Sequence, residues 1–441
     1  MELTVKQATT LKGTVRAPGD KSISHRALLF GALARGETVI RGFLPADDCE
    51  RTVRCLSALG VSLIREGPTF VRIQGRGPAS LREPETTLDA GNSGTTMRLL
   101  LGLLAGQPFP AVLDGDRSLR RRPMGRVVEP LRLMGAQIEG REGGAFAPIC
   151  IRGTRELKPL TYRLPVASAQ VKSALLLAGL QANGVTALRE PAPSRDHSER
   201  LLAAFGATIE QEEGWLKVRG PAVLTGTEVQ IPGDFSAAAF FLVAALLVPG
   251  SEVYLPAVGV NPTRTGLLDV LQAMGARISL GSLRRQGPEP VADLWAGTQS
   301  LRATEVDGSL LPRLIDEVPI LAVAATQAQG TTTIRDAAEL TVKESNRLQA
   351  MAAELGRLGA KVIATDDRLI IEGPTRLRGA VCDSHGDHRV AMALAVAGLV
   401  AEGETRIRGA ECIAISFPDF VDQLAALTKG GVTDGTGQYC H

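Results

Sequence analysis

The chain is poor in aromatic side chains and carries almost no excess charge of either sign. Aromatic residues make up 4% of its 441 residues, which leaves few rings for stacking against nucleic-acid bases. The 49 lysines and arginines nearly balance the 47 aspartates and glutamates, so the formal net charge is +2. A charge this small provides no global field that would attract nucleic acid or an anionic membrane surface. We therefore expect neither as a partner.

Cysteine and histidine are also sparse, and neither forms a recognisable ligand pattern. The six cysteines include no C-x-x-C pair, and free thiols are the usual state in a long chain without a secretion signal. His385 and His388 lie three residues apart, but no further histidine or cysteine cluster accompanies them. The sequence predicts no disulfide framework, no metal site and no cofactor.

Long apolar runs are absent as well. The longest, 237–248, falls short of the roughly 18 residues that would predict a membrane span. The N-terminus, where Glu2 and Lys6 stand among alternating residues, does not resemble a signal peptide. We expect a cytoplasmic protein.

What the sequence does contain is a pattern repeated six times, in which a polar cluster opens an apolar helix that ends at a glycine. The polar clusters lie near Ser22, Ser93, Ser168, Ser236, Asp316 and Asp387, and the closing glycines are Gly36, Gly106, Gly184, Gly250, Gly330 and Gly403. Successive glycines are separated by between 66 residues (Gly184 to Gly250) and 80 residues (Gly250 to Gly330). Such a period indicates one supersecondary unit copied six times.

A second signature recurs inside the period: a short amphipathic helix that ends at glycine followed by alanine or valine. It occurs at Leu59-Gly60-Val61, Met134-Gly135-Ala136, Phe205-Gly206-Ala207, Met274-Gly275-Ala276 and Leu358-Gly359-Ala360. Strand-like alternation follows each one, so every unit reads as strand, helix, strand, helix and two further strands. The polar-start helices are apolar nearly all round, which predicts that they are buried beneath the sheets and the amphipathic helices.

A duplicated segment marks the expected domain boundaries. Pro18-Gly-Asp-Lys-Ser recurs 214 residues later as Pro232-Gly-Asp-Phe-Ser, immediately before the first and the fourth helix. Because proline and glycine punctuate loops, we expect both segments to be crossings between globules. The predicted domains are 20–232, with three repeats, and 1–19 plus 235–428, with the other three. Residues 429–441 are predicted to be a flexible tail.

The helix starts also carry the residues that could perform chemistry. A helix N-terminus presents free N–H groups and about half a positive charge, which suits phosphate and carboxylate. In the first half these starts carry Lys21, Ser22, His25, Arg26, Asn92, Gly94, Ser168, Ala169 and Gln170, with Arg122, Arg195 and His197 in nearby loops. In the second half they carry Asp316, Lys343, Glu344, Arg347, Asp387, His388 and Arg389. Carboxylates beside lysine and arginine suit proton transfer in an anion-binding cleft.

These residues also carry a resemblance to the 5-enolpyruvylshikimate-3-phosphate synthase (EPSP synthase) family, over about residues 5–427. It rests on Pro18-Gly-Asp-Lys-Ser-Ile-Ser-His-Arg, Gly91-Asn-Ser-Gly-Thr, Arg122-Pro-Met-Gly, Ser168-Ala-Gln, Asp316-Glu, Lys343-Glu-Ser-Asn-Arg, Asp387-His-Arg and Ser416-Phe-Pro-Asp. Leu164-Pro-Val-Ala-Ser-Ala-Gln-Val-Lys resembles the glyphosate-tolerant branch. The resemblance implies an α/β fold of two domains, an inside-out α/β barrel with three βαβαββ units per domain. The domains would close on the substrates and exclude water.

The resemblance also implies a substrate pair and an activity. The enzyme would transfer the enolpyruvyl group of phosphoenolpyruvate to the 5-hydroxyl of shikimate 3-phosphate, through a tetrahedral intermediate that then loses phosphate. This step belongs to the shikimate pathway, which leads to the aromatic amino acids and is the target of glyphosate. No cofactor or metal is implied, and a monomer is expected.

Residue roles follow by motif. The implied shikimate 3-phosphate contacts are Lys21, Ser22, Arg26, Ser168, Ala169, Gln170, Arg195, Asp316 and Lys343. The implied phosphoenolpyruvate contacts are Lys21, Asn92, Gly94, Arg122, Gln170, Arg347, His388 and Arg389. Asp316, Glu344 and Lys21 are the implied catalytic residues, with Asp316 oriented on the hydroxyl and Glu344, with Lys21, moving the methylene proton. The division of proton transfer among these three stays open.

The chain departs from the family pattern in three places. Many relatives have lysine shortly before Phe-Pro near the C-terminus, where this chain has Ile415-Ser416. Asn346 stands where an aspartate is usual, and Gly94 stands where the tolerant branch often has alanine. Gly94 leaves room for glyphosate, so we expect competitive inhibition against phosphoenolpyruvate.

Particular residues disfavour two alternative functions. A UDP-N-acetylglucosamine enolpyruvyl transferase would begin with a Lys-Asn pair and carry a loop cysteine, whereas Ser22 follows Lys21 here. A non-catalytic scaffold that binds anions would avoid carboxylates such as Asp316 and Glu344 at its site.

Overall fold

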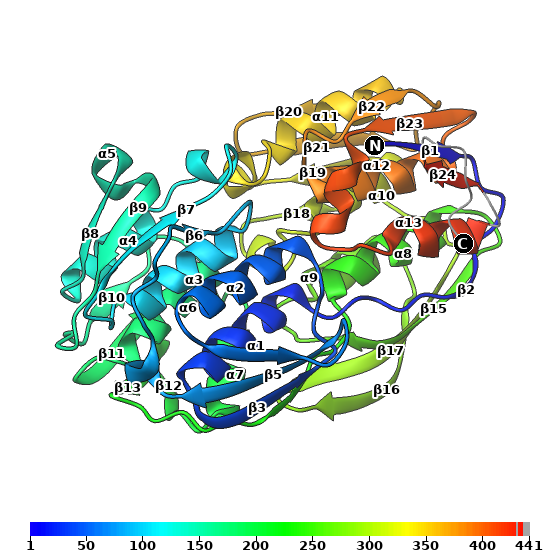
Figure 1. Cartoon of the computed structure of the whole chain (residues 1–441). Helices are drawn as coiled ribbons and strands as arrows, with labels where there is room; N and C mark the ends of the chain where they lie inside the picture. The colour runs from blue at the N-terminus through cyan, green and yellow to red at the C-terminus, as the bar shows by residue number, and fades with distance from the viewer. Residues whose placement is uncertain (429–430, 435–441) are drawn as a thin grey trace. The chain divides into compact units, whose positions relative to one another are not determined.

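The computed structural model describes residues 1–428 and 431–434, which form two compact units (Figure 1). The first unit comprises Gly19–Ile231 and Arg285–Glu289, and the second comprises Met1–Pro18, Pro232–Arg284 and Pro290–His441. Among the helices in the described ranges, none is both long enough and apolar enough to cross a membrane.

The first unit contains three copies of one strand–helix pattern. Its helices are α1 (Lys21–Leu33), α2 (Asp47–Ala58), α3 (Gly94–Leu104), α4 (Gly125–Leu133), the short α5 (Arg141–Gly144), α6 (Ala169–Gly179) and α7 (His197–Ala204). Its strands are β3 (Arg35–Arg41), β4 (Ser62–Arg65), β5 (Phe70–Arg76), β6 (Leu88–Asp89), β7 (Pro110–Asp114), β8 (Gln137–Gly140), β9 (Phe146–Arg152), β10 (Thr161–Arg163), β11 (Gly184–Arg189), β12 (Ile209–Glu212), β13 (Trp215–Gly220) and β14 (Glu228–Gln230).

The second unit repeats the pattern three more times. Its helices are α8 (Phe235–Leu247), α9 (Gly266–Ala273), α10 (Val318–Thr326), α11 (Arg347–Arg357), α12 (His388–Val400) and α13 (Phe420–Thr428). Its strands are β1 (Glu2–Lys6), β2 (Lys12–Thr14), β15 (Glu252–Gly259), β16 (Ser279–Gln286), β17 (Glu289–Gly297), β18 (Glu305–Val306), β19 (Gly330–Ile334), β20 (Lys361–Ala364), β21 (Leu369–Gly373), β22 (Val381–Asp383), β23 (Glu404–Arg408) and β24 (Val432–Asp434). The turn between β16 and β17 groups with the first unit.

All six repeats build the same small sheet. Each sheet has four strands, as in the order β6-β7-β9-β8, where β6 and β7 are parallel and the other neighbours antiparallel. The repeated βαβαββ unit is therefore confirmed. Over the described residues the six sheets stay separate, and closure into a continuous barrel is not observed.

Two repeats exchange their first strands. β2 precedes α1 in the chain, but it pairs in parallel with β15, which follows α8. β14 precedes α8 but pairs in parallel with β3, which follows α1. The exchange occurs at the two Pro-Gly-Asp segments, and in both the aspartate caps the next helix: Asp20 accepts from Ile23 N and Asp234 from Ser236 N.

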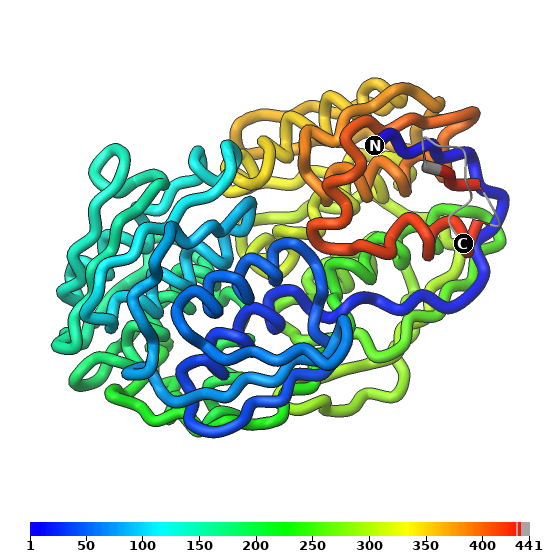
Figure 2. Tube along the Cα trace, viewed as in Figure 1, coloured from blue at the N-terminus to red at the C-terminus, as the bar shows by residue number. Residues whose placement is uncertain are grey.

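The N-terminal strand completes the last repeat. β1 lies between β23 and β24 and is antiparallel to both, so the blue and red ends of the trace lie side by side in Figure 2. The sequence predicted a tail from residue 429, whereas Val432–Asp434 within it form β24. The rest of that predicted tail, 429–430 and 435–441, lies outside the described residues.

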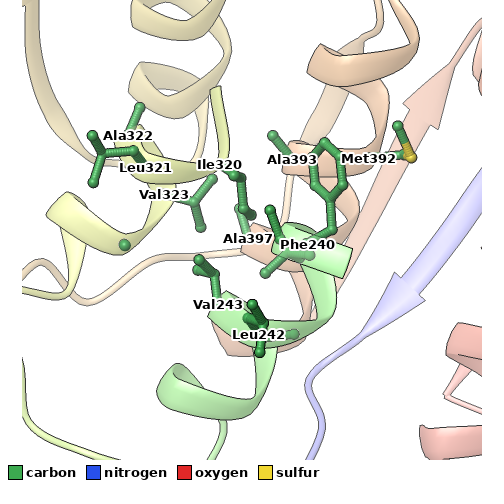
Figure 3. Packing of buried hydrophobic residues seen from close by; sticks show 14 of the residues in the cluster. Phe240, Leu242, Val243, Ile320, Leu321, Ala322, Val323, Met392, Ala393 and Ala397 are labelled. Carbon is green, nitrogen blue, oxygen red and sulfur yellow. The ribbon is translucent and has the colours of Figure 1, made fainter. Parts of the chain in front are cut away.

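The apolar helices are buried, as their composition predicts. In α8 every residue from Phe235 to Leu246 is buried, and the same holds for His388 to Leu399 in α12. In the second unit α8, α10 and α12 pack against one another, with Phe240, Val243 and Ile320 among the interlocking side chains (Figure 3). The amphipathic helices keep one exposed face, as in α11, where Leu348 and Met351 are buried and Gln349 is exposed.

The five predicted glycine stops have the left-handed backbone that favours glycine. Gly60, Gly135, Gly206, Gly275 and Gly359 all have φ between 82° and 109°. This agreement shows that the amphipathic helices end where the sequence predicts.

Helix packing in the first unit depends on one glycine, which gives a test of the core. A β-carbon at Gly102 in α3 would lie 2.2 Å from the Ala174 carbonyl oxygen of α6. We expect Gly102→Ala to lower the free energy of unfolding by about 1–3 kcal/mol, because neither backbone can move away without disturbing the core. Chemical denaturation measures the change.

The matched control is Gly356→Ala in α11, where an added β-carbon meets nothing within 4 Å. It should stabilise the protein by about 0.5–1 kcal/mol, since alanine is the better helix former. If both variants were stabilised, the close approach of α3 and α6 would be wrong.

Candidate functional site

The start of α1 places a lysine beside a carboxylate. Lys21 is the first residue of the helix, and its Nζ lies 2.9 Å from Asp48 Oδ2 at the start of α2. Both side chains are largely shielded from solvent, at 15% and 9% exposure. The ion pair holds the ammonium group at the end of a buried helix, where an anion would also meet free N–H groups.

One turn further, Arg26 is held by hydroxyl groups from another repeat. Its Nε donates to Ser198 Oγ at 2.6 Å and its Nη2 to Ser173 Oγ at 2.7 Å, while Nη1 donates to the Ser22 carbonyl at 2.8 Å. The Arg26 side chain is buried. These three hydrogen bonds fix the position of the guanidinium group.

The start of α3 carries the glycine-bearing turn. Ser93 caps the helix by accepting from Thr96 N. Its neighbour Asn92 accepts a hydrogen bond from Arg122 Nη2 and donates from Nδ2 to Asp116 Oδ2 at 2.6 Å. These hydrogen bonds fix Arg122 beside the turn, and its side chain is nearly fully buried.

The start of α6 is linked to α3 by an amide. Ser168 caps α6, and Ala169 is its first residue. Gln170 accepts from Arg98 Nη1 and donates from Nε2 to Thr95 Oγ1 at 2.8 Å. The three apolar helices of this unit are thus joined at their starts by side chains as well as by their core.

Arg195 lies in the loop 190–196, which is folded around a buried lysine. Lys172 Nζ lies 2.8 Å from a carboxylate oxygen of Glu190 and 2.8 Å from one of Glu199. Burial lowers the pKa of Lys172, but these two carboxylates outweigh that effect and raise the pKa overall. Lys172 therefore stays charged and ties both ends of the loop that carries Arg195 to α6.

In the second unit, one arginine gathers three carboxylates. Arg347 is the first residue of α11 and is 1% exposed. Its Nε lies 2.8 Å from Asp387 Oδ2, its Nη2 lies 2.5 Å from Glu344 Oε2, and its Nη1 lies 3.3 Å from Asp316 Oδ1. Despite burial, these carboxylates raise the pKa of Arg347. The predicted acid–base pair, Asp316 and Glu344, thus shares one guanidinium group.

Further cations surround the same carboxylates. Arg389 Nη1 donates to the Asp316 carbonyl oxygen at 3.1 Å, and its Nη2 lies 3.6 Å from Asp316 Oδ2. His388 is buried at the first position of α12. Burial lowers the pKa of Lys343, and Asp316 opposes this effect through its charge. The cluster places the carboxylates Asp316 and Glu344 near several cations, which suits proton transfer beside an anion.

A second buried network involves Glu317, the residue that follows Asp316. Glu317 accepts from Ser236 Oγ of α8, and Ser236 in turn accepts from Arg264 Nη2 at 2.9 Å. Arg264 also donates to Asp234 Oδ1 at 2.7 Å. Since Glu317 follows Asp316 in the chain, this network fixes the backbone from which Asp316 extends.

The predicted site residues therefore form two groups, each within its own unit. The first unit holds Lys21, Ser22, Arg26, Asn92, Gly94, Arg122, Ser168, Ala169, Gln170 and Arg195, and the second holds Asp316, Lys343, Glu344, Arg347, His388 and Arg389. Sequence reasoning missed several partners that hold them, namely Asp48, Arg98, Asp116, Lys172, Ser173, Ser198 and Arg264. Of these, Arg98 had a signal, because it lies one helical turn after Gly94.

With this geometry described, comparisons with known proteins identify the family. The model of the family described as EPSP synthase (3-phosphoshikimate 1-carboxyvinyltransferase) matches residues 5–424. The chain belongs to the EPSP synthase family.

Individual relatives agree with this membership. The 3-phosphoshikimate 1-carboxyvinyltransferase of Desulforudis audaxviator is 57% identical over 97% of this chain and 99% of its own length. That of Geobacillus kaustophilus is 55% identical over 95% of this chain and 98% of its own length. Among solved structures, the EPSP synthase of Acinetobacter baumannii is 42% identical, with a TM-score of 0.86 over 98% of this chain and all of that one.

A more distant structure shows how far the fold extends. The enolpyruvyl transferase NikO from Streptomyces tendae has a TM-score of 0.79 over 98% of both chains at 21% identity. At that identity, the likeness concerns the fold alone. The predicted family and the mixed α/β fold are confirmed by the closer relatives.

The lysine that holds the 190–196 loop gives a test of this part of the first group. We expect Lys172→Met to lower the free energy of unfolding by about 3–5 kcal/mol, because it leaves two carboxylates without their shared cation in a largely buried place. Thermal or chemical unfolding measures the loss.

Lys217→Met is the matched control in the same unit, because Lys217 pairs with Glu212 on the surface. That change should cost no more than about 1 kcal/mol. Equal losses in the two variants would contradict the structural role of the Lys172 network.

Proposed function

We propose that the two groups of residues are the two parts of one active site, and that the two units are the two domains of the enzyme. As a member of the EPSP synthase family, the chain is a 3-phosphoshikimate 1-carboxyvinyltransferase of the shikimate pathway. Its substrates are phosphoenolpyruvate and shikimate 3-phosphate. The assignment of individual residues to these substrates is our proposal.

The single observation that carries this assignment is the Arg347 cluster. A buried arginine with three carboxylates contributes little net stability, since such groups could be replaced by apolar ones at small cost. Its value lies in chemistry: it keeps Asp316 and Glu344 close together, beside cations that can bind anionic substrates. We propose Asp316 as the group oriented on the 5-hydroxyl and Glu344, together with Lys21, as the group that moves the methylene proton.

The first group is proposed to bind mainly through charge and helix starts. Each phosphate brings about −1.5 to −2 charges, and each substrate adds a carboxylate. For shikimate 3-phosphate we propose Lys21, Ser22, Arg26, Ser168, Ala169, Gln170 and Arg195, joined by Asp316 and Lys343. For phosphoenolpyruvate we propose Lys21, Asn92, Gly94, Arg122 and Gln170, joined by Arg347, His388 and Arg389.

The proposed reaction needs only these side chains. The 5-hydroxyl of shikimate 3-phosphate gives its proton to Asp316 as its oxygen adds to C2 of phosphoenolpyruvate, while the methylene carbon C3 gains a proton from Glu344, acting with Lys21. The resulting tetrahedral intermediate then loses a proton from the new methyl group and expels phosphate by C–O cleavage. Arginine and lysine side chains stabilise the charge on the departing phosphate, which is the usual role of such groups in phosphate chemistry.

We further propose that the enzyme is a cytoplasmic monomer. The cysteines Cys49, Cys55, Cys150, Cys382 and Cys412 are free, which suits a reducing compartment. Light scattering should give the mass of one chain, 46.5 kDa.

Phosphate release with both substrates, and with each omitted in turn, tests the proposed site. Glu344→Gln and Asp316→Asn should each lower kcat by about a hundredfold or more, the usual contribution of a general acid or base. Glu372→Gln is the control, because Glu372 pairs with Lys361 on the surface of the same unit. Full activity in both site variants would overturn the catalytic assignment.

Glyphosate tests the role of Gly94. A β-carbon there would lie 2.9 Å from Arg98 Nη1 and 3.3 Å from Arg122 Nη1, so a methyl group crowds two cations at the proposed phosphoenolpyruvate site. We expect competitive inhibition against phosphoenolpyruvate in the wild type and an inhibition constant raised about tenfold or more in Gly94→Ala. Equal constants would contradict this role.

A further inference from the structure

A buried histidine of α1 has no role in the site described above. His25 is fully buried, between the site residues Lys21 and Arg26 in sequence. Arg26 contacts Ser173 and Ser198 of the third repeat, whereas His25 contacts Thr52 of α2. Arg26 therefore connects α1 to the third repeat, whereas His25 connects it to α2 of its own repeat.

The contact to Thr52 is the first step of a hydrogen-bonded chain. His25 Nδ1 lies 2.7 Å from Thr52 Oγ1, which lies 2.8 Å from Thr96 Oγ1 in α3. Thr96 Oγ1 lies 2.8 Å from Ser93 Oγ, and Ser93 Oγ also accepts from Thr96 N at 3.1 Å. Each of the four side chains is at most 1% exposed. The chain ends at the residue that caps α3, in the turn that holds Asn92 and Gly94.

The direction of these hydrogen bonds depends on the imidazole ring. Burial, and then the charges of Lys21 and Arg26, lower the pKa of His25 well below 6.5, so the ring is neutral and carries one N–H. With the proton on Nδ1, His25 donates to Thr52 and Thr52 to Thr96, and the Thr96 hydroxyl can then donate to Ser93 Oγ at 2.8 Å or to the Asp48 carbonyl oxygen at 3.3 Å. With the proton on Nε2, the whole chain would run the other way, because each hydroxyl has only one hydrogen to donate.

The buried surroundings of His25 favour the first direction. Among residues 1–428 and 431–434, Nε2 has no hydrogen-bond partner. A buried N–H without an acceptor is rarer in proteins than an acceptor without a donor, which places the proton on Nδ1. His25 is then the first donor of the series, and Ser93 Oγ, which accepts from Thr96 N, is also the nearer of the two acceptors for the Thr96 hydroxyl.

We propose that His25 is a positioning residue for phosphoenolpyruvate: through Thr52, Thr96 and Ser93 it holds the turn that presents Asn92 and Gly94. The inference rests on the proposed assignment of that turn to phosphoenolpyruvate. It goes beyond that assignment because His25 acts through other residues and would not contact the substrate itself. The contacts of Arg26 with the third repeat do not involve the hydrogen bonds that run from His25 to Ser93. Binding of shikimate 3-phosphate should therefore be unaffected.

The central test removes the hydroxyl of Thr52 and keeps the shape of its side chain. Thr52→Val should raise the KM for phosphoenolpyruvate about fivefold, the factor expected when one ordinary hydrogen bond is lost. The KM for shikimate 3-phosphate and its affinity measured alone by calorimetry should change less than twofold. His25→Leu should give the same split, and His25→Asn should restore part of it, because its amide can donate toward Thr52.

A double variant separates a relay from two independent effects. His25→Leu combined with Thr52→Val should be no worse than the more damaging single variant, because both break one chain. Thr38→Val is the matched control: Thr38 is buried in the same repeat as His25, and its hydroxyl has no hydrogen-bond partner in the part of the chain that the structure describes. Both KM values should therefore stay unchanged. If His25→Leu does not fold, Thr52→Val and Thr96→Val carry the test alone.

Three results would overturn the proposal: an unchanged KM for phosphoenolpyruvate in Thr52→Val, equal changes for both substrates, or additive losses in the double variant. Asn92→Ala distinguishes this outcome from failure of the proposed site. If it raises the KM for phosphoenolpyruvate and Thr52→Val does not, only the relay is wrong. If Asn92→Ala has no effect, the assignment of the turn itself fails, and the relay proposal falls with it.

Discussion

Six apolar helices are buried along nearly their whole length, and this constraint decides where the enzyme can bind charged molecules. The sides of such a helix are covered by the rest of the protein, so its polar end is the part that a ligand can reach. At that end the free N–H groups favour anions. Each helix start must then fix its polar side chains firmly, because an unpartnered buried group would be costly.

The two units meet this requirement in different ways. In the first unit, Ser173 and Ser198 accept hydrogen bonds from Arg26, Asn92 accepts one from Arg122, and Asp48 pairs with Lys21. In the second unit, carboxylates hold Arg347. The first arrangement positions cations for anion binding. The second places carboxylates beside a cation, which suits proton transfer.

The positions of the helices and of their polar starts could be predicted from the sequence, because helix starts and glycine stops are local signals. Ser93, Ser168 and Asp387 cap the helices that their positions predict. The residues that join these starts could not be predicted this way. Thr52 and Thr96 lie 44 positions apart, and nothing in their neighbourhoods distinguishes them from ordinary helix threonines.

The pairing of strands that lie far apart in the sequence was even harder to predict. β2 and β14 are three residues long, too short for their own pattern to choose a partner. Their pairing with β15 and β3 follows from where the chain crosses between the units. β24 was missed for a similar reason, since its only strand neighbour, among the described residues, is β1 at the opposite end of the chain.

The position of β1 has a consequence for how the protein is made. A ribosome makes Glu2–Lys6 long before it makes the neighbours of this strand, β23 and β24. Every sheet of the first unit, in contrast, consists of strands between residues 35 and 230. The first unit can therefore fold during translation, while the opening strand must wait, unpaired, for almost the entire polypeptide to emerge.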